Sequence, residues 1–483
     1  MLAALTAAIP EVVISAMFTK FKALFGVQDM TVGSPFSCLL KFAVPLLIGN
    51  LAQLMYLTMD AIIVGRYIGD VALSAIGAAM PPYNFFIVLF MGAGSGITVM
   101  VSQYFGAKDY DNLSVSIGNS ITIVALASVF ITVVATPLTG PVLRLVNTPP
   151  ESFDIAKAYL TILFLGSVGN GFYNVLSSIL RGLGDSVFPL IVLIGTVILS
   201  TVLDIVLIAG FGMGLRGAAW STVIAQALSS VICLVKITTM RSTVRIRVAM
   251  LRPIRRITRQ IISLGGPNAV SMGIMFATTV FVQSISNRMG YLVVTAITVT
   301  QRLDAFAVIP SQTFQIVAGT YTGQNIGAGN IDRVKQGSRM VLSMSFAFTV
   351  VMVAAMLLFG RHLLGLFTKT ESVIAMGMTF ILVLMPAYLA MAFSGSWMGV
   401  MRGAGDAVGP MWISMVNNVV LRIPLSYFIA YASRSEVYPN GNPNSVFMAL
   451  TIAMVVGCVI TTIYYRAGKW RGKSIIGQKP GEV

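Results

Sequence analysis

Long apolar runs separated by short polar connections dominate the sequence from about residue 39 onward. A bilayer core of roughly 30 Å takes about 20 helical residues, so runs of this length predict membrane-spanning helices. Twelve spans are predicted, approximately at residues 39–63, 72–103, 113–138, 155–180, 187–209, 217–238, 261–287, 293–322, 339–360, 373–400, 408–431 and 445–465. The runs contain Gly and Pro and lack the alternating pattern of barrel strands. We therefore expect an all-α integral membrane protein.

An internal repeat divides these spans into two halves. The segment Arg181-Gly-Leu-Gly-Asp185 recurs 221 residues later as Arg402-Gly-Ala-Gly-Asp406. The segment Gln103-Tyr-Phe-Gly-Ala107 recurs at the same offset as Gln324-Asn-Ile-Gly-Ala328. With six spans per copy, both copies start on the same side of the membrane, so the repeats are parallel. We expect two six-helix bundles with a cleft between them.

The domain boundaries follow from this division. We expect an N-terminal interfacial segment (1–38) with a helix at 12–27, an amino-terminal bundle (39–240), a basic linker (241–260), a carboxy-terminal bundle (261–466) and a basic tail (467–483). The linker holds seven arginines and no acid between Arg241 and Arg259. Contact with lipid headgroups explains this composition better than specific ligand binding does.

Composition and charge narrow the function classes. Hydrophobic residues make up 56% of the chain and charged residues only 10%, against roughly 25% charged in soluble domains. Of the 32 Lys and Arg residues, 22 fall on the side of the termini and 8 on the other. Positive charge marks the cytoplasm, so we expect both termini to be cytoplasmic and the protein to lie in the inner (plasma) membrane. This asymmetry accounts for the net charge of +16 without a nucleic-acid partner.

The inventory of reactive residues predicts no catalytic or metal site. The chain has three cysteines and one histidine, which is too few for a disulfide framework, a zinc site or a Cys/His pair. The Gly-rich turns follow no strand and carry no Lys/Ser pair, so they are not phosphate loops. We expect neither an enzyme nor an ATP-driven pump, and no cofactor.

Five charged residues lie well inside the spans: Asp60, Asp204, Asp304, Arg302 and Arg422. A charge near the bilayer centre costs roughly 3 kcal/mol or more, so each needs a partner, a proton or a water-lined cavity. These residues are therefore the first functional candidates.

Asp60 shares one helical face with Gln53 and Tyr56, seven and four residues earlier, while Pro45 permits a bend in the same helix. Met59 is a candidate for an adaptable apolar wall.

Asp204 continues a polar stripe formed by Ser200 and Thr196. Burial favours the neutral form of a carboxyl group, which is what a proton carrier needs. Membership of a helix-packing network is the alternative for Asp60 and Asp204, and we favour function.

The charged residues of the second half do not repeat the pattern of the first. Asp304 and Arg302 are two residues apart and point about 200° away from each other on a helix, so they do not pair directly. Function and packing are equally good explanations for Asp304. Arg422 is interpreted as structural, because the repeat equivalent of Asp204 is Leu425 and the acidic site is not copied.

An ordered set of motifs resembles the multidrug and toxic compound extrusion (MATE) family, and most closely its DinF-like prokaryotic branch. The motifs are Pro45-Leu-Leu-Ile-Gly-Asn50, Asp60-Ala-Ile-Ile-Val-Gly-Arg66, Gln103-Tyr-Phe-Gly-Ala107, Tyr159-Leu, Arg181-Gly-Leu-Gly-Asp185, Asp204 followed by Gly212-Met-Gly-Leu-Arg-Gly-Ala-Ala219, and Gln324-Asn-Ile-Gly-Ala-Gly329. The likeness covers about residues 30 to 430.

The resemblance implies antiport of organic, usually cationic, compounds against H⁺ or Na⁺. It maps the family's coupling network onto Asp60, Asp204, Tyr159 and Thr222, and the bending proline onto Pro45. Two positions depart from the family: Ser200 and Leu57 stand where asparagines are common. The seventh span also lacks the acid that another branch uses, so the resemblance gives no cation site in the second half.

We therefore expect a monomeric secondary exporter of amphipathic organic cations in the lipid bilayer, working by alternating access. Gln53, Tyr56, Met59, Asp304 and Arg302 are candidates for its substrate cleft. A lipid-linked oligosaccharide flippase of the same superfamily is the alternative, although its anionic substrate favours several cations in the cleft. A channel would need a continuous polar pore, and no filter signature is present.

Overall fold

The computed structural model describes residues 26–240, 243–245, 247–436 and 438–476. The interfacial helix expected at residues 12–27 falls almost entirely outside this part of the chain. The described residues form helices joined by short connections, with no strand among them. This confirms the expected all-α membrane architecture.

From residue 26 to residue 240, the first half contains seven α-helices and a π-helical segment. They are α3 (Pro35–Tyr67), α4 (Asp70–Gly106), α5 (Tyr110–Leu145), α6 (Pro150–Leu165), α7 (Ser167–Gly182), α8 (Val187–Asp204), the π-helix η1 (Ile205–Gly210) and α9 (Leu215–Thr239). The helices α6 and α7 meet at an angle of 48° and together make one broken span. Six spans result, as the hydropathy pattern predicts.

The second half repeats this arrangement. After the 3-10 turn η2 (Val248–Leu251) come α10 (Arg255–Asn287), α11 (Tyr291–Gly327), α12 (Ile331–Gly365), α13 (Glu371–Gly403), α14 (Val408–Met415), the π-helix η3 (Val416–Arg422), α15 (Ile423–Ala432), α16 (Ser445–Ala467) and the 3-10 turn η4 (Lys469–Gly472). Among the described residues, eleven helical segments are long and apolar enough to span a membrane, and the α6–α7 pair makes twelve.

Several helices extend beyond the predicted spans. Helix α5 continues to Leu145 and α12 begins at Ile331, whereas the apolar runs covered only 113–138 and 339–360. Hydropathy reports the part of a helix that lies in the hydrocarbon, and polar residues continue the same helix into the interface.

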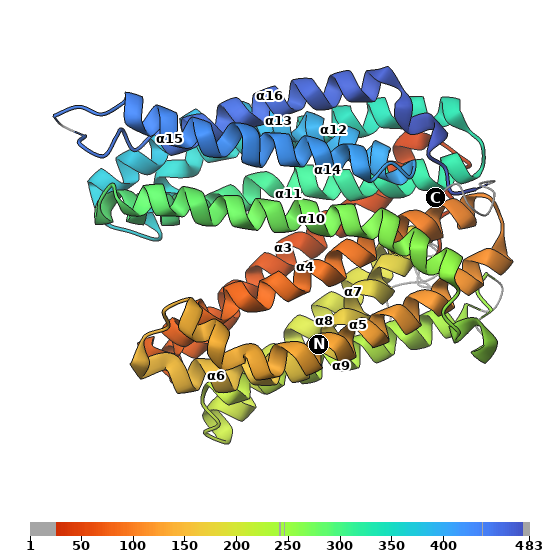
Figure 1. Cartoon of the computed structure of the whole chain (residues 1–483), viewed down its shortest axis with the longest axis horizontal. Helices are drawn as coiled ribbons and strands as arrows, with labels where there is room; N and C mark the ends of the chain where they lie inside the picture. The colour runs from red at the N-terminus through yellow and green to blue at the C-terminus, as the bar shows by residue number, and fades with distance from the viewer. Residues whose placement is uncertain (1–25, 241–242, 246, 437, 477–483) are drawn as a thin grey trace, which may run out of the picture.

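The helices of the two halves form two groups that converge at one end of the molecule (Figure 1). At this end α3 begins and α16 finishes, and we call it the terminal face. Toward the opposite end, the far face, the groups diverge (Figure 1).

At the terminal face, each half inserts the start of one helix into the other half. Leu39 and Phe42 at the start of α3 are buried in a cluster with Phe314 and other second-half residues, and Figure 1 shows the red start of α3 among those helices. Conversely, Ile257 and Ile261 at the start of α10 belong to the first half's core. This exchange ties the two halves together at the terminal face.

Glycines allow two helix backbones to touch where the halves meet. A Cβ at Gly106 of α4 would lie 1.9 Å from the carbonyl oxygen of Gln324 on α11. A Cβ at Gly327 of α11 would lie 2.0 Å from the carbonyl oxygen of Gln103 on α4. Only residues without a side chain permit this approach, so the repeated Gln-x-x-Gly motif marks the crossing of the halves.

The glutamines of the same motif form a pair of matching hydrogen bonds between the halves, which we call the glutamine clasp. Gln103 Nε2 donates to the carbonyl oxygen of Gly403 at 2.8 Å, and Gln324 Nε2 donates to that of Gly182 at 3.2 Å. Both glutamines are fully buried. Their side-chain oxygens accept the backbone N–H groups of Ile475 and Met30, so the clasp also holds the segments next to both termini.

The Gly-rich turns of the second repeated motif start the following helices. Gly184 and Gly405 adopt φ angles of +89° and +100°, which favour glycine. The next residues, Asp185 and Asp406, accept backbone N–H groups three residues further on, at Phe188 and Gly409. The motif is therefore a turn with a helix cap, which supports its exclusion as a phosphate loop.

The close contact of α4 and α11 predicts that one added methyl group at Gly106 lowers the stability of the protein. Gly106→Ala should destabilise the protein by about 1–3 kcal/mol, because the new Cβ meets backbone atoms and must push α4 and α11 apart. Gly77→Ala on the same helix is the matched control, since a Cβ there meets nothing within 4 Å. Thermal unfolding in detergent checks this, and equal midpoints for the two variants would contradict the role of the crossing.

Candidate functional site

The first half encloses a cavity of about 170 Å³ between α3, α7, α8 and α9. Its wall is rich in amide and hydroxyl groups. The lining residues are Pro45, Leu46, Gly49, Asn50, Gln53, Tyr56, Asn170, Tyr173, Asn174, Ser177, Arg181, Ser186, Pro189, Leu190, Leu193, Thr196, Val197, Thr222, Ala225 and Gln226. Such a wall offers hydrogen-bond donors and acceptors inside an apolar bundle, as ligand sites do.

One side of the cavity is a polar face of α7 that the sequence interpretation missed. Asn170, Asn174, Ser177 and Arg181 all line the cavity and are spaced four, three and four residues apart. This is the spacing of residues on one face of a helix. The spacing of these polar residues is visible in the sequence, but it does not show that this face meets a cavity.

Hydroxyl groups close the end of the cavity that is deeper in the bundle. The Tyr56 hydroxyl lies 3.2 Å from Ser200 Oγ and 3.3 Å from Thr222 Oγ1, so it hydrogen-bonds to α8 and α9. Tyr56 and Thr222 also line the cavity. The predicted residues Tyr56, Ser200 and Thr222 are therefore brought together.

Asp204 lies next to the hydroxyl groups of Tyr56, Ser200 and Thr222 but does not line the cavity. It is 1% exposed, and its Oδ1 accepts a hydrogen bond from Ser221, the neighbour of Thr222. Sequence reasoning did not identify Ser221, because its partner is on another helix. Asp204 ends α8, and the chain continues as the π-helix η1, a geometry often found at functional sites.

The two first-half carboxyl groups lie in the same neighbourhood of the bundle. Asp60 and Asp204 are close enough for their charges to interact, and Tyr159 on α6 interacts with both. Oδ1 of Asp60 and Oδ2 of Asp204 are buried, and neither has a hydrogen-bond partner among the described residues. Buried oxygens without partners are costly when ionised, so this pair is suited to take up a proton or a small cation.

No group of three or more His, Cys, Asp or Glu residues is placed to hold a metal ion in the described part of the chain. Any ion bound at Asp60 and Asp204 would therefore need hydroxyl or backbone oxygens as further ligands.

The remaining first-half candidates differ in whether they line the cavity. Gln53 and Pro45 line the cavity, and Pro45 lies inside the continuous helix α3. Bending at Pro45 stays a prediction. Met59 is 49% exposed and is not among the lining residues.

The second-half candidates form a different cluster away from this cavity. Asp304 on α11 interacts electrostatically with Arg422 and contacts Tyr388 on α13. Arg302 is exposed, so it does not share the surroundings of Asp304. Within the described part of the chain, no ion pair joins Arg302 to Asp304. None of these residues lines the first-half cavity.

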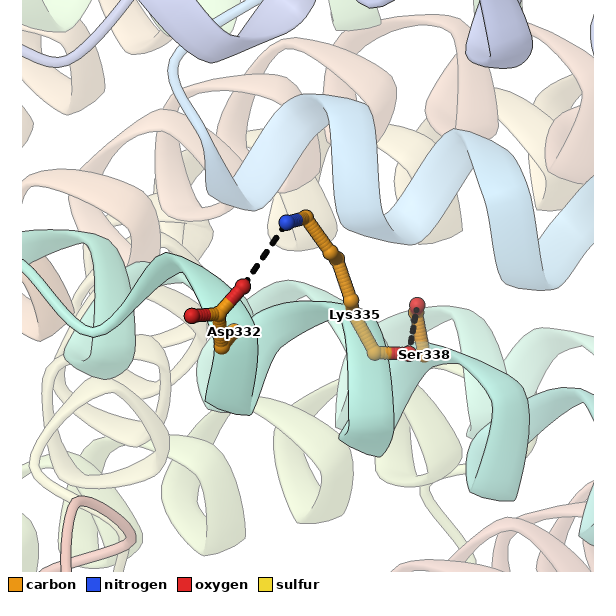
Figure 2. A network of polar contacts seen from close by, with 3 residues as sticks. All are labelled: Asp332, Lys335 and Ser338. Atoms are coloured by element: carbon orange, nitrogen blue, oxygen red, sulfur yellow. Dashed lines mark hydrogen bonds and ion pairs between the residues drawn. The ribbon is translucent and has the colours of Figure 1, made fainter.

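An exposed acid offers a contrast to the buried pair. Asp332, at the start of α12, forms an ion pair of 2.7 Å with Lys335, and its side chain is 95% exposed (Figure 2). A solvated pair of this kind contributes little to stability. Asp332 is the repeat equivalent of Asp111 and provides a control acid outside the buried site.

A family model described as MatE matches the chain twice, over residues 45–206 and 267–428. The probable multidrug resistance protein YpnP of Bacillus subtilis is 25% identical, over 93% of this chain and 99% of its own. The multidrug export protein MepA of Staphylococcus aureus is 22% identical, over 82% of this chain and 87% of its own.

Solved structures share the fold. One, described as a MATE in complex with MaL6, superposes with a TM-score of 0.85 at 23% identity, covering 92% of this chain and 98% of its own. Another, described as the outward-facing conformation of a multidrug resistance MATE family transporter, also gives a TM-score of 0.85, at 22% identity. The two matched segments cover more than half of the chain and fall one in each six-span half, so the protein belongs to the MATE family of membrane transporters.

Proposed function

We propose that the protein is a secondary multidrug exporter of the plasma membrane, which antiports amphipathic organic cations against H⁺ or Na⁺. The observation that carries the proposal is the pair Asp60 and Asp204, each with a buried oxygen lacking a partner among the described residues. Neither acid lines the polar cavity, but both interact electrostatically with Tyr56, which does. The names of the relatives, which are multidrug resistance and export proteins, agree with an efflux role.

The carboxyl pair offers a physical basis for exchange. When Asp60 and Asp204 are ionised, their charge attracts a cationic substrate into the apolar bundle. Uptake of a proton or Na⁺ cancels that attraction. Because the two ligands then compete for one charge, loading the coupling ion favours substrate release, which is the linkage that antiport requires.

The glutamine clasp offers a basis for alternating access. In this structure the halves are joined at the terminal face and diverge toward the far face (Figure 1). Export requires a second arrangement, in which the clasp opens and the far-face ends approach. The change would act as a rigid-body movement of two bundles around their crossing.

The charge distribution supports the orientation of this cycle. The connections at the terminal face carry most of the Lys and Arg residues, so we propose that this face and both termini are cytoplasmic. The substrate would then leave toward the far face.

The first test measures transport. Proteoliposomes containing the protein should accumulate or release ethidium when a pH gradient or a sodium gradient is imposed, because ethidium is a flat lipophilic monocation that suits an acidic, apolar site. The two gradients are applied separately to identify the ion. Movement of anionic compounds with no movement of ethidium would favour the flippase alternative.

The second test concerns coupling. Asp60→Asn and Asp204→Asn should each abolish gradient-driven ethidium transport, because an amide can neither bind a proton nor attract the cation. The double variant should be no worse than either single one, since residues that act as a unit are not additive. Asp332→Asn is the matched control and should keep full transport. Substantial transport by Asp60→Asn would place coupling elsewhere, with Asp304 the next residue to test.

The third test concerns orientation. Arg247→Cys and Lys473→Cys, each in a background with Cys458 replaced, should react only with thiol reagents supplied from the cytoplasm. Leu366 at the far face is 79% exposed. Leu366→Cys should therefore react from outside intact cells. Labelling of Arg247→Cys from outside would overturn the proposed topology.

A further inference from the structure

We propose that Arg181 is an anion-binding residue at the terminal-face end of the first-half cavity, where it accepts a carboxylate group of the transported compound. This inference rests on the proposed export function and assigns a substrate-recognition role to one residue of the cavity wall. It starts from a charge that the exchange mechanism does not use.

Arg181 is the one charged residue among the described residues that line the cavity. Its side chain is partly buried, and its Nη2 donates to Ser178 Oγ at 2.8 Å. Within the described part of the chain, no acid forms an ion pair with it. Asp185, the nearest acid in sequence, caps α8 through the N–H of Phe188. The guanidinium therefore lacks a counter-charge from the described residues.

The missing counter-charge indicates the chemistry of a ligand. A guanidinium taken out of water is costly unless it is paired with an anion. Its five N–H donors form a planar fork that matches a carboxylate in two parallel hydrogen bonds. Ser178 uses one donor, and the others remain for a group in the cavity. A carboxylate there would gain a charge-assisted contact that a neutral ester cannot make.

The length of the cavity allows a second charge on the same compound. The lining residues of α7 run from Asn170 to Arg181, an axial rise of roughly 16 Å. Tyr56 and Thr222 close the deeper end, next to the carboxyl pair. A zwitterion could place its cationic end there and its carboxylate at Arg181, so that both buried charges are compensated.

The repeat supplies a matched comparison for Arg181. Arg402 occupies the equivalent position in the second Gly-rich turn and is also partly buried, with its Nε lacking a hydrogen-bond partner among the described residues. Arg402 does not line the cavity. A purely structural role of the motif would affect both arginines alike, whereas a ligand contact would affect Arg181 alone.

The experiment compares two dyes that differ in one group. Rhodamine 110 carries a carboxylate, and rhodamine 123 is its methyl ester. Binding of each to the purified full chain in detergent is followed by fluorescence anisotropy. Arg181→Gln should weaken rhodamine 110 binding about tenfold or more, as expected for a lost charge-assisted hydrogen bond. Rhodamine 123 binding should not weaken, because the cationic ester loses no hydrogen bond and a repelling charge is removed. Arg402→Gln should alter neither dye.

A second variant tests the same contact without removing Arg181, in case Arg181→Gln does not fold. Ser177→Asp places a carboxylate one helical turn before Arg181 on the same cavity wall, so it should neutralise the guanidinium and weaken rhodamine 110 selectively. Equal effects of Arg181→Gln on both dyes, or no effect on rhodamine 110, would overturn the inference. If rhodamine 123 fails to bind the unmodified protein at all, the proposed use of the cavity by cationic substrates fails as well, so the two failures are distinguishable.

Discussion

The backbones of α4 and α11 touch at the terminal face, where Gly106 and Gly327 each face a carbonyl oxygen of the other helix. This contact fixes the point about which the two halves are arranged. The glutamine clasp, the exchanged starts of α3 and α10, and the segments at Met30 and Ile475 all gather around it. The first-half cavity lies within one of the two bundles that this contact joins.

The polar site in that bundle depends on three helices meeting closely. Tyr56 connects α3 to α8 and α9 through Ser200 and Thr222, and Ser221 on α9 holds one oxygen of Asp204. These neutral hydroxyl groups solvate the site without supplying a compensating charge. The carboxyl pair therefore keeps a demand for a proton or a cation, which an ion pair with a protein arginine would have satisfied.

Much of this architecture was predictable from the sequence, for identifiable physical reasons. The twelve spans follow from the length of apolar runs, and the crossing of the halves from a repeated motif with Gly at a fixed place. The grouping of Asp60 with Tyr56 follows from helical periodicity on one chain segment. Ser221 was not predictable in this way, because its contact with Asp204 joins two helices whose relative rotation no periodicity reports.

Contacts between different helices also explain why three other features were not predicted. The amide face of α7, from Asn170 to Arg181, has a clear period, but only packing decides whether such a face meets a cavity, a neighbour or a lipid. The role of the glutamines in the clasp was also hidden, since their partners are backbone carbonyls of the other half. Helix ends such as Leu145 lay beyond the apolar runs, where hydropathy has no signal.

Movement of the two halves about their terminal-face contact should change a distance across the far face. Leu145 and Leu366 are repeat equivalents at the far face and are 80% and 79% exposed. Spin labels at these two positions allow double electron–electron resonance in lipid nanodiscs, with and without saturating ethidium and across a range of pH and sodium concentrations. We expect a second, shorter distance whose population changes with ion and substrate. A single unchanged distance under every condition would contradict it.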